Sequence, residues 1–213
     1  MNIFKSIFAG NRNFFFVFAL FFVSGLILLL TEGRAGTFLL LNPYHRQPLD
    51  QLFGWVTFLG DGLFTILVIV LLLSTRKFMQ AWQVLAAFLV SALLAQLLKN
   101  AFSMPRPKQF FMPGVYGHFI EGVTLTGFAS FPSGHSTSIF ALATMLALFE
   151  KNKKWNVVYL LGAIAVGYSR IYLGQHFLQD VLAGSVIGML VSVSVHWIFL
   201  EKFPSLRAAT PLQ

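Results

Sequence analysis

Residues 14–30 read FFFVFALFFVSGLILLL, a stretch without a single charged residue. A helix needs roughly 20 mostly apolar residues to cross the hydrocarbon core of a bilayer, so this stretch has the composition of a membrane span. The whole chain has 213 residues, of which 57% are hydrophobic and only 10% are charged. A soluble domain with so few charges cannot cover that much apolar surface, which indicates that lipid surrounds the protein.

Five more apolar runs follow the first one along the chain. Together they predict an all-α fold, a polytopic membrane helical bundle with six transmembrane helices that form a single domain over residues 1–213. A cleavable signal peptide is the alternative for the first run. The run is longer than the about 7–15 apolar residues of such a peptide, however, and the polar stretch TEGR follows it. The expected spans are residues 13–30, 52–73, 78–98, 136–149, 155–168 and 177–200.

An even number of spans places both ends of the chain on one side of the membrane. Of the 15 lysines and arginines, nine fall on the side of the termini and six on the opposite side. Cytoplasmic loops carry the excess of basic residues, so both termini are predicted to be cytoplasmic. Three polar stretches then share the non-cytoplasmic face, where they can form one pocket. These stretches are KNAFSMPRP (99–107), FPSGH (131–135) and SRIYLGQH (169–176).

The charges in these stretches predict an anionic ligand. Lys99, Arg106 and Arg170 are cations at or near membrane depth, where an unpaired charge is costly. Asp180, just beyond the third stretch, is the one carboxylate available to them, so positive charge is in surplus. Arginine donates hydrogen bonds in a planar fork that suits phosphate oxygens, and lysine adds a compact charge. A phosphate group is therefore the expected ligand.

Ser133, Gly134 and His135 stand where the fourth span begins. The free backbone N–H groups of a helix N-terminus favour an anion, Ser133 adds a hydroxyl, and Gly134 lets the backbone approach closely. The alternative is that Ser133 or Ser136 only caps the helix, since serine is a preferred cap.

His176 and Asp180 lie four residues apart, on one face of a helix, so the carboxylate can hold one ring nitrogen and direct the other outward. The pair is either a reactive base or nucleophile or a paired core histidine. His135 on the same face favours chemistry, with one histidine as nucleophile and one as general acid. A zinc site of His135, His176 and Asp180 is a weaker alternative, because the three cations would repel the metal.

The three motifs resemble those of the type 2 phosphatidic acid phosphatase superfamily, which also includes the vanadium haloperoxidases. They are Lys99-x6-Arg106-Pro107, Pro132-Ser133-Gly134-His135 and Ser169-Arg170-x5-His176-x3-Asp180. The resemblance implies that His176 is the nucleophile that becomes a phosphohistidine, that Asp180 orients it, and that His135 protonates the leaving oxygen and later activates water. It also implies that no cofactor or metal takes part and that phosphate is bound by Lys99, Arg106, Ser133, Gly134 and Arg170.

A membrane phosphatase for a lipid phosphate or diphosphate at the non-cytoplasmic surface follows from this resemblance. The compact plan is similar to bacterial members of the family, which implies a bacterial inner membrane. Undecaprenyl diphosphate is the preferred substrate, with phosphatidylglycerophosphate and lipid A phosphate as alternatives. Competing functions are a lipid phosphotransferase with the same intermediate, a non-catalytic lipid-phosphate transporter or binding protein, and, least favoured, a haloperoxidase.

The expected partners are the lipid substrate and membrane lipids. Nucleic acid is not expected, because the formal charge of +8 is scattered over short loops that contact lipid headgroups. The sequence does not predict an oligomeric state. Gly184-x3-Gly188 indicates close helix packing. Asp61, between two glycines, indicates a helix break, and no role is predicted for His45, His118 or His196. The aromatic stretch QFFMPGVYGHF (109–119) is interpreted as an interfacial anchor or a gate for lipid.

Overall fold

The computed structural model describes residues 3–204, and these residues form helices joined by loops, without strands. Each of the six predicted spans falls on a helix or a helix pair, so the all-α prediction is confirmed over this range. The helices are α1 (Ile3–Gly10), α2 (Arg12–Leu41), α3 (Gln47–Phe58), α4 (Gly62–Ser74), α5 (Phe78–Phe102), α6 (Pro107–Phe110), α7 (Gly134–Phe149), α8 (Trp155–Tyr172) and α9 (Leu178–Lys202).

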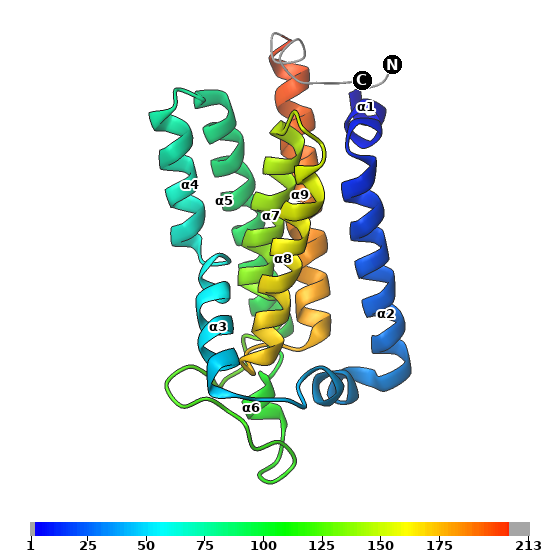
Figure 1. The fold of residues 1–213 in the computed structure, drawn as a ribbon, viewed down its shortest axis with the longest axis vertical. Helices are drawn as coiled ribbons and strands as arrows, with labels where there is room; N and C mark the ends of the chain where they lie inside the picture. The colour runs from blue at the N-terminus through cyan, green and yellow to red at the C-terminus, as the bar shows by residue number, and fades with distance from the viewer. Residues whose placement is uncertain (1–2, 205–213) are drawn as a thin grey trace.

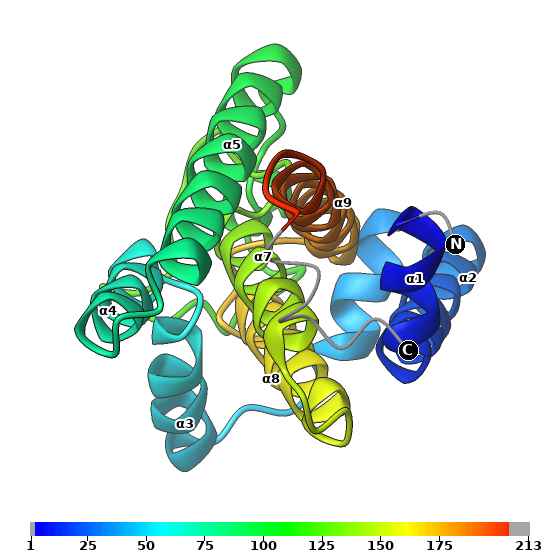
Figure 2. The same cartoon turned by 90° about the horizontal axis from the view of Figure 1, so that it is seen from above.

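Helix α7 lies at the centre of the bundle, with α5, α8 and α9 around it (Figure 2). Most of its residues are buried, as expected for a helix that is apolar on every side. The pairs α1–α2 and α3–α4 lie on opposite sides of this core (Figure 2). The central helix therefore has little contact with lipid, and its first residues are held in a fixed position by three neighbours.

Helices α7 and α9 pack closely because two glycines of α9 face α7. A Cβ atom at Gly184 would lie 2.7 Å from the carbonyl oxygen of Ser133. A Cβ atom at Gly188 would lie 2.7 Å from the backbone nitrogen of Ala141. Ser192, one turn further along α9, donates a hydrogen bond of 2.9 Å to the carbonyl of Ala141. The interpretation of Gly184-x3-Gly188 as a packing motif is confirmed.

The number of spans is confirmed only in part. Three segments are long and apolar enough to cross a membrane, namely Arg12–Leu41, Phe78–Phe110 and Leu178–Lys202. The pair α3–α4, bent by 49°, raises the number to four, and α7 is apolar but shorter. A short helix at the centre of a bundle is surrounded by other helices, so its length need not match the bilayer. Six membrane crossings stay a prediction.

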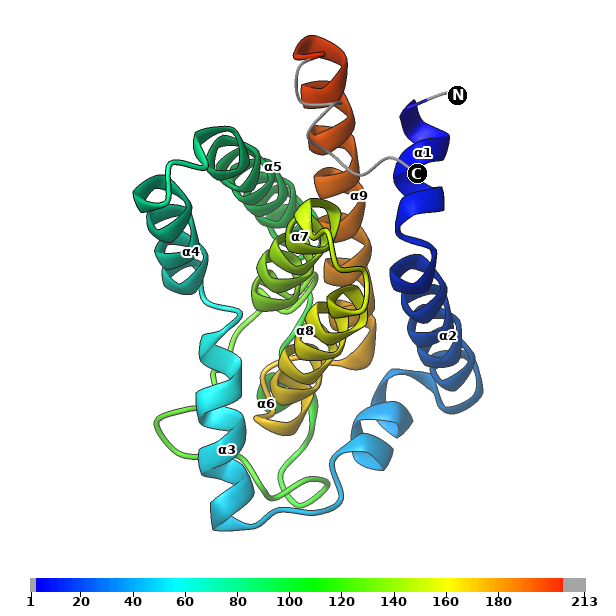
Figure 3. The same cartoon turned by 45° about the horizontal axis from the view of Figure 1, so that its top comes forward.

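The first span was predicted to end at about Leu30, and the structure breaks the helix three residues later, at Gly33. Helix α2 consists of two helical stretches joined at a kink, because the backbone at Gly33 is not helical, with φ of 68° and ψ of −177°. Glycine tolerates this conformation because it has no Cβ atom. Figure 3 shows the chain turning at the end of the long part of α2 before it reaches α3. The polar residues 31–34 therefore mark the end of the first helical stretch, and a shorter helical stretch continues beyond them to Leu41.

The second predicted span is broken between α3 and α4, as the glycines around Asp61 indicated. Asp61 caps α4, because its carboxylate accepts a hydrogen bond of 2.9 Å from the backbone nitrogen of Leu63. A Cβ atom at Gly60 would lie 3.1 Å from both the Cβ and the backbone oxygen of His135. The break therefore rests against the first turn of α7.

The two ends of the described chain lie together. Helix α1 and the last turns of α9 are at one end of the bundle, and the long connection between α6 and α7 is at the other (Figure 1). This arrangement agrees with an even number of crossings. The polar stretches all lie near the end that carries the α6–α7 connection.

Candidate active site

Hydrogen bonds join the three polar stretches to one another, although they are far apart in sequence. Lys99, near the end of α5, donates 2.8 Å to the carbonyl of Ala129. Arg106 Nη1 donates to the carbonyl of Gln175 at 3.0 Å and to its side-chain oxygen at 3.2 Å. The backbone nitrogen of Ser133 donates 3.0 Å to the carbonyl of Asp180. The structure thus brings together the residues that the sequence predicted to share one pocket.

His176 and Asp180 form a buried pair at the start of α9. His176 Nδ1 faces Asp180 Oδ2 at 3.5 Å, and the two side chains are 3% and 0% exposed. The same carboxylate oxygen accepts hydrogen bonds from Ser130 Oγ at 2.5 Å and from the backbone nitrogen of Phe177 at 2.9 Å. These bonds fix the carboxylate beside Nδ1 of His176, a buried nitrogen that has no hydrogen-bond partner. Asp180 is thus in position to orient the imidazole through Nδ1 and to leave Nε2 free.

The imidazole of His176 is in an environment that favours its neutral form. Burial lowers the pKa of His176 well below its ordinary value, and this effect outweighs the opposite influence of Asp180. The positive charges of Arg170 and Arg106 lower it further. A neutral imidazole has a lone pair to donate, so His176 is suited to act as a nucleophile at neutral pH.

Three cations surround this pair. Arg170 is only 7% exposed; its Nη1 donates 2.6 Å to Thr57 Oγ1, and its Nε has no hydrogen-bond partner. Arg170, Arg106 and Lys99 lie within electrostatic range of one another. Asp180 is the carboxylate near Lys99 and Arg106, and Asp61 is the one near Arg170. Three cations therefore face two carboxylates, and positive charge is still in surplus in the folded site. An anion with several oxygens would satisfy these donors.

The start of α7 combines a helix cap with an open surface. Ser133 is the N-cap, and its Oγ accepts from the backbone nitrogen of Ser136 at 3.3 Å and from its hydroxyl at 3.0 Å. The capping role considered from the sequence is therefore present, and the hydroxyl proton of Ser133 is left to donate elsewhere. An added Cβ at Gly134 would meet nothing within 4 Å, so an anion can approach this backbone.

His135 lies on the wall of a cavity of about 280 Å³. One part of the wall is polar, with Lys99 and Asp61 beside His135, and the other part is apolar, with Phe88 and Ala92. His135 is within electrostatic range of Lys99, Arg106 and Arg170. His176 is 2% exposed and is not part of this wall. A charged headgroup with an attached apolar chain matches the two parts of the cavity.

Comparison with known proteins identifies the family of this site. Residues 80–204 match the model of the PAP2 superfamily. The chain belongs to this superfamily. The matched region includes every predicted site residue, and the resemblance to the type 2 phosphatidic acid phosphatases is confirmed.

Two relatives and one solved structure show the range of this similarity. The lipid A 1-phosphatase of Rhizobium etli is 33% identical over 162 residues, 76% of this chain and 58% of that protein. Phosphatidylglycerophosphatase B of Bacillus subtilis is 33% identical over 178 residues, 76% of this chain and 81% of that protein. The crystal structure of Aquifex aeolicus LpxE matches with a TM-score of 0.68 and 29% identity, covering 76% of this chain and 94% of that one. This PAP2 chain thus spans about three fifths of the length of the lipid A 1-phosphatase. Its apolar helices and its membrane phosphatase relatives show that it is an integral membrane protein.

Several residues of this PAP2 site were not predicted from the sequence. Ser130 directly precedes the stretch FPSGH and Gln175 lies within SRIYLGQH. This closeness to the motifs in sequence is the signal that could have identified them. Thr57, the partner of Arg170, lies in an apolar run and gives no such signal. Asp61 was interpreted as a helix break and is also part of the cavity wall.

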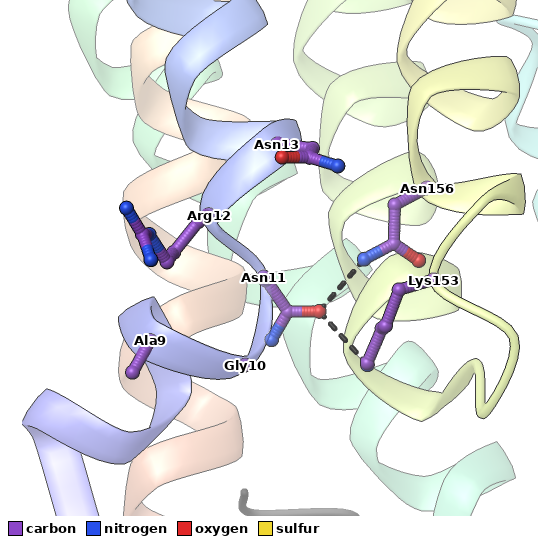
Figure 4. Close-up of a pocket in the computed structure, with 7 residues that line it drawn as sticks. All are labelled: Ala9, Gly10, Asn11, Arg12, Asn13, Lys153 and Asn156. Carbon is purple, nitrogen blue, oxygen red and sulfur yellow. Dashed lines mark hydrogen bonds between the residues drawn. The ribbon is translucent and has the colours of Figure 1, made fainter.

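A second cavity, of about 200 Å³, lies at the other end of this PAP2 bundle (Figure 4). Asn11 Oδ1 accepts hydrogen bonds there from Lys153 Nζ at 2.9 Å and from Asn156 Nδ2 at 2.8 Å. These bonds join the start of α2 to the start of α8 (Figure 4). No histidine or carboxylate lines this cavity, so its lining offers no candidate nucleophile or general acid for phosphate chemistry.

The weaker zinc alternative is not supported by the geometry. Among residues 3–204, His135, His176 and Asp180 do not bring their ligand atoms close enough together to hold a metal ion. The three residues that do so are His45, Asp50 and His118, outside the phosphate site.

Proposed function

We propose that the chain is a membrane phosphatase that hydrolyses a lipid phosphate or diphosphate through a phosphohistidine intermediate. The observation that carries this proposal is the buried His176–Asp180 pair, surrounded by three cations and combined with a second histidine on a cavity that is partly apolar. Binding alone would need the cations but not an oriented, neutral imidazole.

The reaction has two steps. In the first, Nε2 of His176 attacks phosphorus, and the bond to the lipid oxygen breaks as His135 gives that oxygen its proton. In the second, His135 takes a proton from water while the water oxygen attacks phosphorus, and the bond to His176 breaks. Inorganic phosphate leaves, and both histidines return to their starting protonation states. Lys99, Arg106, Arg170, Ser133 and the N–H groups near Gly134 bind the phosphate oxygens in both steps, where charge develops.

The substrate is proposed to enter sideways from the bilayer, because the apolar wall of the His135 cavity suits a lipid chain. The similarity to a lipid A 1-phosphatase and to a phosphatidylglycerophosphatase supports these two lipid phosphates ahead of undecaprenyl diphosphate, the substrate preferred from the sequence. The site is proposed to face the non-cytoplasmic side, for which the excess of basic residues beside the termini is the support.

A phosphate-release assay on the purified protein tests the proposal. Lipid A, phosphatidylglycerophosphate and undecaprenyl diphosphate are each supplied in mixed micelles, with the His176→Ala variant as the control. We expect phosphate release from at least one substrate by the native chain and none by the variant.

Each assay is repeated with a lipid that carries a free hydroxyl group. If the substrate loses its phosphate only when this acceptor is present, the reaction is phosphotransfer and not hydrolysis. Tight binding of a lipid phosphate without turnover of any lipid would show that the chain is a binding protein and not a phosphatase.

A further inference from the structure

Two histidines and an aspartate with no predicted role meet at the end of the bundle that carries the α6–α7 connection. His45 lies in the connection before α3, Asp50 in the first turn of α3, and His118 in the connection between α6 and α7. His45 Nδ1 is 3.9 Å from Asp50 Oδ1, and His118 Nε2 is 3.5 Å from Asp50 Oδ2. The two imidazole rings are stacked, with their centroids 3.7 Å apart.

We propose that His45 Nδ1, an oxygen of Asp50 and His118 Nε2 bind a divalent transition-metal ion, for which Zn²⁺ is the best match. Two imidazole nitrogens and one carboxylate oxygen form a donor set typical of zinc, with a fourth position left for water. The three ligand atoms lie within 4.8 Å of one another. Metal–ligand bonds of about 2.0–2.2 Å would require only small side-chain movements to close this triangle.

The hydrogen bonds around the cluster orient its ligands toward a shared centre. His45 Nε2 is 3.2 Å from the carbonyl of Asn42, an oxygen that can only accept, so this nitrogen is expected to carry the ring proton. Nδ1 then presents a lone pair toward Asp50, and it is buried without a hydrogen-bond partner. The lone pair of Nδ1 and the carboxylate of Asp50 repel each other unless a cation lies between them. A metal ion would supply this cation.

The outer partners of the cluster are those expected for a metal site. Tyr116 Oη lies 2.7 Å from His45 Nε2, and Tyr172 Oη donates 2.7 Å to Asp50 Oδ1. Bonds of this kind, from a carbonyl or hydroxyl to the far side of a ligand, fix its orientation in metalloproteins. An ion pair of exposed groups would not need this support.

The position of the cluster gives the metal a structural role beside the phosphate site. His118 and Tyr116 belong to the connection between α6 and α7, and Thr124 of the same connection donates 3.0 Å to the carbonyl of Leu173. Gln175, the partner of Arg106, donates to the carbonyl of Val123. A metal at this cluster would therefore fasten the connection to α3 and α8 and hold it over the cationic site. Binding of the ion does not depend on the proposed function.

Metal titration of the full chain tests this proposal. The protein is purified without a histidine tag, treated with a chelator, transferred to lipid nanodiscs and titrated with Co²⁺ and then Zn²⁺. We expect one ion per chain, with the visible absorption of four-coordinate Co²⁺, and slower hydrogen exchange in residues 112–127 when the ion is bound.

Variants distinguish this cluster from the phosphate site. His118→Ala is expected to weaken binding by more than about 100-fold, because loss of an outer partner alone typically costs 10–100-fold. Tyr172→Phe removes only an outer partner and should fall in that smaller range. His135→Ala and His176→Ala should bind the ion as the native chain does.

Two results would overturn the proposal. One is the absence of saturable binding to the native chain at micromolar metal. The other is binding that survives His118→Ala but is lost in His176→Ala, which would place the ion among the phosphate-site histidines. The side chain of His118 is half-exposed, so His118→Ala is expected to keep the native fold. A thermal unfolding curve of the variant checks this.

Discussion

Asp180 is the residue on which the geometry of the phosphate site depends. Its carboxylate is buried, faces His176 and accepts hydrogen bonds from Ser130 and from the backbone of Phe177. Its own backbone carbonyl accepts from Ser133, so one residue joins the nucleophile to the cap of α7. A change at any of these partners is therefore expected to alter the position of the nucleophile before it alters the fold.

The two histidines are expected to differ in the intermediate they leave behind. His176→Ala removes the proposed nucleophile, so no covalent phosphoenzyme should form. His135→Ala removes the proposed acid, whose contribution is typically about 10²–10⁴-fold for a poor leaving group. With p-nitrophenyl phosphate, which leaves readily, phosphorylation should survive in His135→Ala and hydrolysis should slow, so the phosphoenzyme accumulates.

Mass spectrometry of the peptide containing residues 170–180 after an alkaline quench measures this intermediate, because phosphohistidine is labile in acid. Phosphate found on His135, with turnover retained in His176→Ala, would reverse the assigned roles.

Ser130→Ala tests a positioning residue that the sequence analysis did not identify. The variant removes a hydrogen bond to an ionised carboxylate, a contribution of about 1.5–3 kcal/mol. If that contribution is lost in the transition state, kcat should fall by roughly 10–100-fold with little change in KM. Ser130→Thr retains the hydroxyl and should restore most of the activity, whereas Ser74→Ala, at an exposed helix end, should have no effect. An equal loss in Ser130→Thr would mean that the site needs the volume of serine and not its hydrogen bond.

At the scale of helices, the contact between α7 and α9 determines where the reactive groups lie. Ser133 caps helix α7, which begins with Gly134 and His135, and α9 begins two residues after His176. The two glycines of α9 allow the helices to approach at backbone distance. The separation between the two histidines is thus set by a packing contact deeper in the bundle.

Gly188→Ala is expected to destabilise the protein. The added methyl group would meet the backbone of α7, and overpacking of this kind typically costs about 1–3 kcal/mol. Gly162→Ala is the matched control, because Gly162 is an exposed helical position with nothing within 4 Å of an added Cβ. The control should be neutral or stabilising by up to about 1 kcal/mol, since alanine favours a helix. Thermal unfolding in detergent measures both, and equal melting temperatures would show that α9 can move away from α7 without cost.

At the scale of the whole molecule, the site relies on side-chain cations, so chemistry is expected without a metal ion. Excess chelator should leave phosphate release nearly unchanged. The measurement is made in the His118→Ala variant, so that loss of an ion from the His45–Asp50–His118 cluster cannot affect the result. Activity that disappears with chelator and returns with Mg²⁺ or Zn²⁺ would contradict a metal-free reaction.

The orientation of the bundle gives a further whole-molecule prediction. A reporter fused after Gln213 should lie in the cytoplasm, and a tag inserted beside Met112 should be accessible from outside. The reason is the excess of basic residues beside the termini together with an even number of crossings. Protease protection in intact spheroplasts measures both positions. A cytoplasmic tag at Met112 would place the phosphate site on the inner face.

Much of the site could be predicted from the sequence, because the motif residues are separated by short, regular spacings and each has a recognisable charge or nucleophile. The contacts that position these residues could not be predicted from the sequence. Thr57 bonds to Arg170 across 113 residues and Ser130 to Asp180 across 50, and no local pattern reports such pairs. The same holds for His45, Asp50 and His118, which come together only through the path of two connections.

The positions of the helices could be predicted, because the length of each apolar run determines them. The bends within α2 and between α3 and α4 were harder to predict, because they depend on backbone conformation. The end of the first span was predicted to within three residues of the break at Gly33, but the second helical stretch of α2, up to Leu41, was not predicted. The break at Asp61 was predicted, but its contact with His135 depends on how α3 and α4 pack on α7.

The break between α3 and α4 makes the proposed acid sensitive to bilayer thickness. A span bent by 49° changes its effective length when its bend changes, and a helix adapts in this way to a hydrocarbon layer that is thinner or thicker than its apolar stretch. Gly60, at the bend, packs so close to His135 that an added Cβ would lie 3.1 Å from the Cβ and the backbone oxygen of His135. A change in the bend is therefore expected to reach the proposed proton donor. Lipid chain length is therefore expected to act on the rate of the proposed first chemical step through the shape of a single broken helix.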